Sequence, residues 1–146
     1  MEFVIHELIN ISIYSVVGIV LMLLGSFLVD LVIPCSFPEE IKKGNKAIGW
    51  ISAGVYIAVG FIIKAAISSP GEVIDEIENN LAAGLLSTVF YYAIGAIFLM
   101  IGYLLLKIIN RRYDLNKEVG EGNAAAGIMV FGMFVGLGLV ISGVIA

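Results

Sequence analysis

Two stretches of this 146-residue chain decide its fold: GNKAIGWISAG, Gly44 to Gly54, and GNAAAGIMVFG, Gly122 to Gly132. Each stretch follows a short polar segment and begins a long apolar run. Laying residues 41–68 over residues 119–146 without a gap gives eight identical residues in 28. The chain is therefore predicted to contain two copies of one design, 78 residues apart.

The composition places both copies in a membrane. With 60% hydrophobic and 14% charged residues and a mean hydropathy of +1.06, the chain cannot form the polar surface of a soluble protein. Crossing a hydrocarbon core takes about 20 apolar helical residues, and four runs are long enough: roughly 11–33, 47–68, 81–109 and 124–146. We predict an all-α membrane protein with four transmembrane helices in a single domain, 1–146, made of repeat 1 (1–69), an external linker (70–78) and repeat 2 (79–146).

The relation between the two repeats follows from the number of spans. Each repeat crosses the membrane twice, so both enter it from the same side. We expect two parallel two-helix repeats related by a pseudo-twofold axis along the membrane normal. In the first helix of each repeat the 78-residue offset pairs Tyr14 with Tyr92, whereas an offset of 77 residues pairs Gly18 with Gly95 and Gly25 with Gly102. Both alignments are therefore open in these two helices.

Small residues form a stripe on the second helix of each repeat. Their spacing of 7, 4 and 7 keeps them on one helix face, where they allow another backbone to approach closely. We expect the stripes to face each other or the first helices of the repeats, in a tightly packed four-helix bundle. The helix-packing residues are Ala47, Gly54, Ala58 and Ala65 in repeat 1 and Ala125, Gly132, Gly136 and Gly143 in repeat 2.

A short interfacial helix is predicted before each Gly-Asn pair. Ser36 with Glu39 forms an S-x-x-E capping box, and Asp114 supplies the N-cap of the second short helix. Gly44 and Gly122 suit the left-handed position after a helix end. The asparagine that follows each glycine can cap the next transmembrane helix.

The basic residues predict the orientation. Seven of the eight lysines and arginines lie at the ends of the first and third spans and in the loops that follow them, whereas residues 69–80 hold none. Since basic residues in short loops stay in the cytoplasm, loops 34–46 and 110–123 are expected to be cytoplasmic and both termini outside the cell (inner) membrane. The net charge of −4 gives no indication of a nucleic-acid partner.

The segments EEIKKGNKAIGWISAG (39–54) and KEVGEGNAAAGIMVFG (117–132) resemble the signature of the domain-of-unknown-function family 350, the YjfL-like prokaryotic membrane proteins. The resemblance covers essentially the whole chain as two tandem copies. The first copy departs from the pattern at Ser36, where an aspartate such as Asp114 is usual, and at Lys46, where a small or polar residue is common. The resemblance implies the fold but no activity and no catalytic residues.

The two corners are the first candidate site. Asn45 and Asn123, with Gly44 and Gly122, place polar side chains and free backbone N–H groups at the cytoplasmic starts of two helices. Such groups could bind an anion or line the mouth of a pathway. Simple helix capping explains the same residues.

Three charged residues lie within or near the spans: Asp30, Lys64 and Lys107. A charge in the membrane is costly, so Lys64 is expected to reach the outer face, near Glu72 or Asp75. Asp30 and Lys107 are equivalent under the 77-residue offset. They could form a salt bridge between the repeats, or Asp30 could bond to a loop backbone or nearby lysine while Lys107 reaches the headgroups.

The sequence does not favour an enzyme. His6 and Cys35 stand alone on opposite sides of the membrane, without the partners that a metal site or a nucleophilic dyad needs. We therefore expect no catalytic residues, no metal and no cofactor.

Two functions fit these observations. The first is permeation: a homo-oligomer that conducts or carries a small ion or solute across the lipid bilayer. The second is a non-transporting scaffold or accessory subunit that binds a partner protein through its cytoplasmic loops. A shortage of buried polar residues counts against the first, and the lack of a domain outside the membrane counts against the second.

Overall fold

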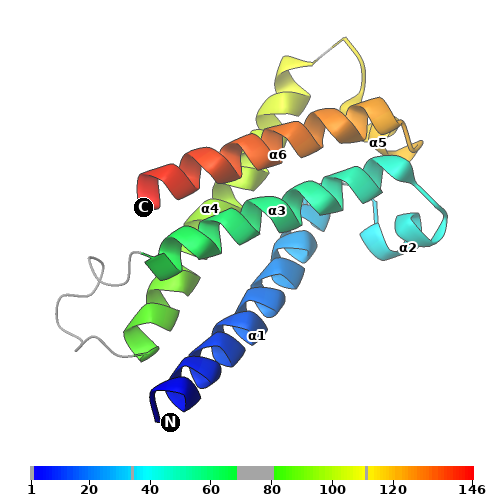
Figure 1. Cartoon of the computed structure of the whole chain (residues 1–146). Coiled ribbons are helices and arrows are strands. Elements are labelled where there is room, and N and C mark those ends of the chain that lie inside the picture. The colour runs from blue at the N-terminus through cyan, green and yellow to red at the C-terminus, as the bar shows by residue number, and fades with distance from the viewer. Residues whose placement is uncertain (1, 34, 69–80, 111) are drawn as a thin grey trace.

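The structure is a computed structural model that describes residues 2–33, 35–68, 81–110 and 112–146 (Figure 1). It contains four long helices, and all four are long and apolar enough to cross a membrane. This confirms the prediction of an all-α protein with four candidate transmembrane helices, whereas the linker 70–78 lies outside the described residues. The helices are α1 (Glu2–Asp30), α2 (Phe37–Lys42), α3 (Lys46–Ser68), α4 (Leu81–Ile109), α5 (Leu115–Gly120) and α6 (Ala124–Ile145).

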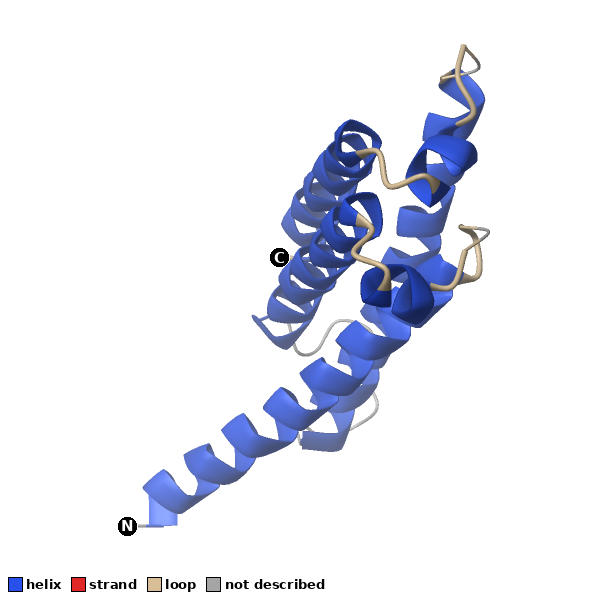
Figure 2. Cartoon of the chain, turned by 90° about the vertical axis from the view of Figure 1, so that its right-hand side faces the viewer, coloured by secondary structure: helices blue, strands red, loops and turns tan. Residues whose placement is uncertain are grey.

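The first helix differs from its predicted span. It begins at Glu2, not near residue 11, because the intervening segment contains no glycine or proline that would end a helix. Figure 2 shows the N-terminal half of α1 extending away from the other helices.

Helix α3 lies at the centre of the subunit. It contacts α1, α4 and α6, and its contact with α6 is the most extensive between any two helices of the described chain. The two helices run in parallel and side by side (Figure 1). Helix α6 itself contacts only α3, α4 and α5 extensively, so much of its surface is open.

The backbones of α3 and α6 approach very closely. A Cβ added at Gly127 would lie 2.5 Å from the Cα of Ala47, and one added at Gly138 would lie 2.6 Å from the Cα of Ala58. The helices can approach this closely only because these two positions of α6 have no side chain. The close approach supplies the van der Waals packing that holds helices together in lipid. Ala47 and Ala58 are fully buried.

The stripe predicted on α3 is buried, but the stripe predicted on α6 is not. Gly132, Gly136 and Gly143 are exposed, and a Cβ added to any of them would meet nothing within 4 Å; Ala125 is exposed too. The expectation that these four residues pack within the subunit is therefore corrected. Helix α6 turns a different face, with Gly127 and Gly138, toward α3.

Glycines on α1 and α4 pack in matching ways. A Cβ at Gly25 would lie 3.0 Å from the Val59 side chain of α3, and a Cβ at Gly102 would strike Leu137 of α6. Gly25 and Gly102 are 77 residues apart, and Val59 and Leu137 are 78 apart. These contacts agree with the two predicted offsets, while the pseudo-twofold axis stays a prediction.

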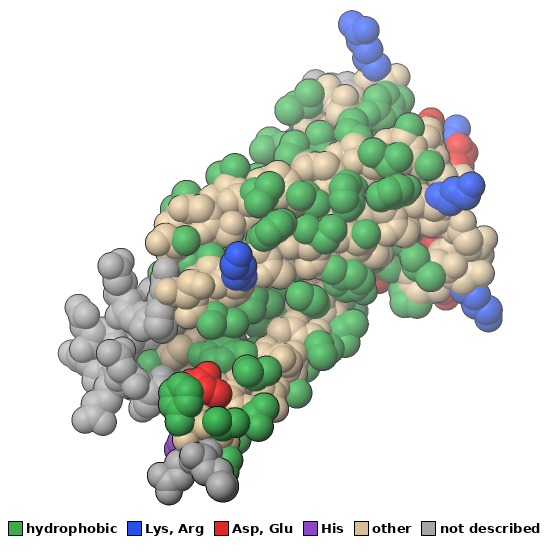
Figure 3. All heavy atoms as spheres, in the orientation of Figure 1, with side chains coloured by type: hydrophobic (Ala, Val, Ile, Leu, Met, Phe, Trp, Pro, Cys, Tyr) green, Lys and Arg blue, Asp and Glu red, His purple; other side chains and the backbone are tan. Residues whose placement is uncertain are grey.

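The surface suits a bilayer. Large apolar side chains are exposed along the long helices, and on the face drawn in Figure 3 most lysine and arginine side chains gather at the end that holds α2 and α5. We call this end the basic end. A molecule with apolar flanks and a charged end is stable with its flanks in lipid.

Candidate functional site: the two corners at the basic end

Each short helix ends in a corner with the same backbone structure. Gly44 has a φ of +79° and Gly122 a φ of +81°, in the left-handed region that glycine adopts without steric cost. The asparagine N–H that follows donates to a carbonyl of the short helix, at 2.9 Å for Asn45 and 3.0 Å for Asn123. The left-handed corners predicted from the sequence are therefore present.

Both asparagines cap the helix that follows. The Oδ1 of Asn45 accepts from the N–H of Ile48 at 3.1 Å, and the Oδ1 of Asn123 accepts from the N–H of Ala125 at 3.0 Å. Each side-chain amide also donates to a glutamate of the preceding short helix, Glu40 or Glu118. The capping role alone thus accounts for much of what these side chains do.

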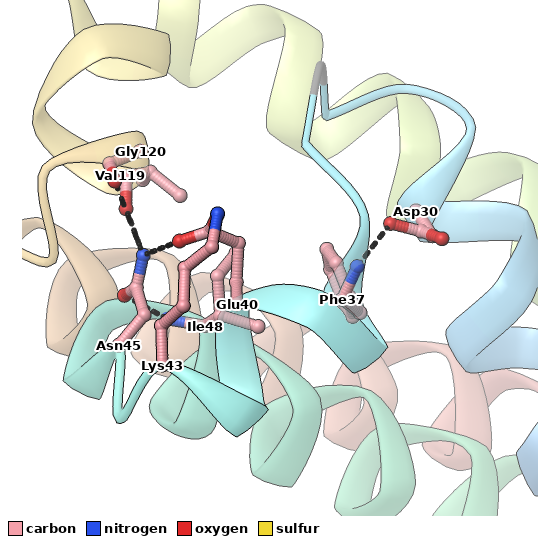
Figure 4. Close-up of polar contacts among 8 residues, drawn as sticks. All are labelled: Asp30, Phe37, Glu40, Lys43, Asn45, Ile48, Val119 and Gly120. Atoms are coloured by element: carbon pink, nitrogen blue, oxygen red, sulfur yellow. Dashed lines mark hydrogen bonds and ion pairs between the residues drawn. The ribbon is translucent and has the colours of Figure 1, made fainter.

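Asn45 does one thing that Asn123 does not. Its Nδ2 donates across the basic end to the carbonyl oxygens of Val119, at 2.9 Å, and Gly120, at 3.3 Å (Figure 4). This links the corner of the first half to the end of α5 in the second half. Asn45 is accordingly half-buried, whereas Asn123 is exposed.

Glu40 was not singled out from the sequence, yet it organises the first corner. Its carboxylate accepts from the Lys43 ammonium at 2.8 Å and from the Asn45 amide at 2.9 Å, and its side chain is 14% exposed. The hydrogen bond from Lys43, and then the one from Asn45, hold the pKa of Glu40 below its ordinary value. The i, i+3 spacing of Glu40 and Lys43 was the available signal.

A polar hollow of about 420 Å³ lies between the corners. The amide of Asn45 is already bonded to Glu40 and to two carbonyls, so it offers an anion little. The hollow could instead hold a polar group of a partner or water. It is lined by Lys43, Gly44, Asn45, Lys46, Gly120, Glu121 and Gly122.

The N-terminus of α2 is capped differently from the prediction. Ser36 makes no side-chain capping bond; the Oδ1 of Asp30, at the end of α1, accepts from the N–H of Phe37 at 2.8 Å instead (Figure 4). In the second half Asp114 caps α5 directly, as predicted. Asp30 thus replaces the aspartate that the first half lacks, because Phe37 N–H is one of the unpaired donors at a helix start.

The remaining charges do not pair across the halves. In the described chain the ion pairs are Lys43–Glu40 and Lys117–Glu121, so Asp30 and Lys107 form no salt bridge. Lys107 is exposed, and Lys64 is exposed near the end of α3. The partners expected for Lys64 lie outside the described residues.

Tyr103 is a further residue that the sequence did not single out. It is fully buried in α4, and its hydroxyl donates to the Oδ1 of Asn116 in α5 at 2.7 Å. At the predicted 77-residue offset the corresponding position of α1 is Ser26, which lines an open pocket of about 300 Å³ together with Asp30.

Cys35 is a free thiol in the connection before α2. Burial, and then the carboxylates of Glu40 and Asp30, raise the pKa of this thiol despite the opposing effect of Lys43. Within the described residues no group of three or more His, Cys, Asp or Glu side chains could hold a metal ion.

Comparison with known proteins identifies the family of the chain. A family model described as a domain of unknown function (DUF350) matches residues 3–145. The chain belongs to this family. It is also 26% identical over 124 residues to a UPF0719 transmembrane protein of Aquifex aeolicus, a match that covers 84% of this chain and 44% of that protein.

A second relative is similar along nearly its whole length. The UPF0719 transmembrane protein YshE of Bacillus subtilis is 26% identical over 137 residues, which is 94% of this chain and 93% of that protein. No solved structure matches. These relatives support a multi-pass membrane protein and carry no statement of activity.

Proposed function

We propose that the protein provides a pathway for a small ion or solute across the membrane, and that this pathway runs between copies of the chain. The observation that supports it is a pair of lysines on one open face of α3. Lys46 and Lys64 are both exposed and stand five helical turns, about 27 Å, apart on the same side of the helix. They would therefore lie near opposite ends of the span.

The described interior of one subunit favours a route outside it. Apart from tyrosines, the polar residues in the core of the described chain are Ser52, Ser87 and Thr88, and Thr88 bonds to a carbonyl of its own helix at 2.8 Å. At Gly127 and Gly138 the backbones of α3 and α6 approach so closely that an added Cβ would not fit between them. A pathway is therefore expected outside the subunit, along the face that carries the lysines.

Two lysines at the ends of such a pathway would favour anions over cations. Purified protein in liposomes should release chloride or another small anion faster than a matched cation. Lys64→Gln should reduce this preference. Lys107→Gln, which removes an exposed charge from the last turn of α4, should leave it unchanged. Absence of flux for every ion and solute in the panel, with correctly folded protein, would contradict the proposal.

Binding of a partner protein, as a non-transporting scaffold, is a second candidate function, which the hollow between the corners favours. Lys43, Lys46 and Glu121 surround an open polar surface at the basic end, which a protein loop could contact. Protein that folds and assembles normally but passes nothing in liposomes would favour this second function.

A further inference from the structure

We propose that a second copy of the chain docks on the exposed face of α6 that carries Ala125 and Gly136. The second copy would use the face of its α3 that carries Gly49 and Gly60, so that copies join head to tail. The contact would be the same one that α3 and α6 already make inside the subunit. The proposed pathway needs such an assembly, whereas the assembly does not need conduction.

The internal contact has two different sides. Ala47 and Ala58 of α3 enter notches that Gly127 and Gly138 leave on α6. Because the two sides differ, the contact is heterologous, and a heterologous contact leaves one unused half on each partner.

The unused halves are present in the sequence at the repeat offset. On α6, Ala125 and Gly136 are equivalent to the two alanines of α3, and both are exposed. On α3, glycine occupies positions 49 and 60, which are equivalent to the two notches of α6.

Packing inside the subunit explains the notch at Gly60 in part, because the flexible Met22 side chain of α1 lies beside it, but it does not explain the notch at Gly49. A Cβ at Gly49 would meet nothing within 4 Å, and a Cβ at Gly60 would meet only the Met22 methyl group, at 3.3 Å. On α6, by contrast, both equivalent glycines are required by a backbone 2.5–2.6 Å from the added Cβ. The α6 face of one copy therefore fits the α3 face of the next, with Ala125 opposite Gly49 and Gly136 opposite Gly60.

A pair on other helices gives the same arrangement. Inside the subunit, a Cβ at Gly95 of α4 would lie 2.5 Å from Ile62 of α3. The equivalent residues are Gly18 of α1, where a Cβ would meet nothing within 4 Å, and Val140 of α6, which is 65% exposed. Docking of α1 and α3 of a second copy beside α6 would bring Val140 to the Gly18 notch.

This arrangement also agrees with the orientation that the bilayer requires and with the position of Lys46 and Lys64. The internal contact joins parallel helices, so neighbouring copies would have the same orientation in the bilayer. By helical spacing, Lys46 and Lys64 share a side of α3 that lies between the side with Ala47 and Ala58 and the side with Gly49 and Gly60. Copies that close into a ring would turn these lysines toward its axis.

Cysteine cross-linking in membranes tests the inference directly. Trp50 and Phe131 are in edge-to-face contact inside the subunit, with ring centroids 5.4 Å apart; their equivalents between copies are Ile128 and Ala53. In a Cys35→Ser background, differently tagged Ile128→Cys and Ala53→Cys chains, co-expressed and oxidised, should form a mixed dimer. A chain that carries both substitutions should form a ladder of dimers, trimers and larger species.

The controls separate head-to-tail assembly from its alternatives. Each single variant alone should stay uncross-linked, and Ile128→Cys with Phe98→Cys, an exposed position on α4, should give no product. Dimers from a single variant would indicate a symmetric twofold contact, and absence of the mixed dimer would mean that lipid covers α6. Either result would overturn the proposal.

One substitution links the result to the α6 face. Gly136→Leu should abolish the ladder without lowering the melting temperature of the dissociated subunit, since a Cβ there meets nothing in the chain. Ala93→Leu, at an exposed position of α4, should leave the ladder intact. An intact ladder with Gly136→Leu would contradict the docking face, and cross-linking without ion flux would refute only the proposed pathway.

Discussion

Asn45 and Asn123 occupy the same position in two corners of the same backbone structure, yet only Asn45 also bonds to the other half of the molecule. The Gly-Asn pair alone predicted the left-handed glycine and the helix cap, because both depend on local backbone geometry. The bonds from Asn45 to the carbonyls of Val119 and Gly120 depend on how the halves pack. No local pattern could have predicted which of the two asparagines makes them.

Substitution of the two asparagines should therefore have unequal effects. Asn45→Ala removes a cap and leaves partly buried acceptors unpaired, so it should cost about 1–3 kcal/mol of unfolding free energy. Asn123→Ala removes an exposed cap and should cost about 0.5–1 kcal/mol. Thermal unfolding in detergent, in a Gly136→Leu background that keeps copies apart, measures both; equal losses would show that the bridge to α5 contributes nothing.

Glu40 predicts a pH dependence at the same corner. Because the Lys43 and Asn45 bonds lower the pKa of Glu40 in the folded protein, its stabilising effect is present above the ordinary glutamate pKa, about 4.3. It is lost as the pH falls through the lowered folded value. Between about pH 5 and about pH 3, the melting temperature of the unmodified protein should therefore fall by more than that of Glu40→Gln. Parallel curves for the two proteins would show that the Glu40 carboxylate does not stabilise the folded protein.

At the scale of the helices, the sequence predicted the spans and the small-residue surface but not the face that α6 uses. Both faces of α6 carry small residues at helical spacing: Gly132 and Gly136 on one side, Gly127 and Gly138 on the other. Periodicity identifies such faces but cannot choose between them, because the choice depends on where α3 and α4 lie. The asymmetry of the α3–α6 contact is a property of the packed molecule.

The two faces should respond differently to one methyl group. Gly127→Ala places a Cβ 2.5 Å from the Cα of Ala47, and backbone cannot yield as a flexible side chain can. We expect a loss of about 1–3 kcal/mol in subunit stability, seen as a lower melting temperature and aggregated protein in gel filtration. Gly132→Ala, which meets nothing within the chain, should leave the dissociated subunit as stable as before. The reverse order would mean that α6 is rotated.

For the whole molecule, composition and charge predicted a four-span membrane protein with one basic end, and the described helices have that form. Sidedness rests on the distribution of lysines and arginines alone. The basic end, with Cys35, is expected in the cytoplasm, and Ala146, at the far end of α6, is expected outside.

Labelling of Cys35 tests the sidedness, provided that the state of its thiol is considered. Burial and the nearby carboxylates raise the pKa of Cys35, so its thiolate is scarce at neutral pH and the reaction should be run at about pH 8.5. A membrane-impermeant maleimide should leave Cys35 unlabelled in intact cells and label it after permeabilisation.

In a Cys35→Ser background, Ala146→Cys should react in intact cells, and Lys42→Cys, at an exposed position of the basic end, should react only after permeabilisation. Labelling of Lys42→Cys in intact cells, with Ala146→Cys protected, would reverse the orientation and with it the side on which a partner could reach the corners.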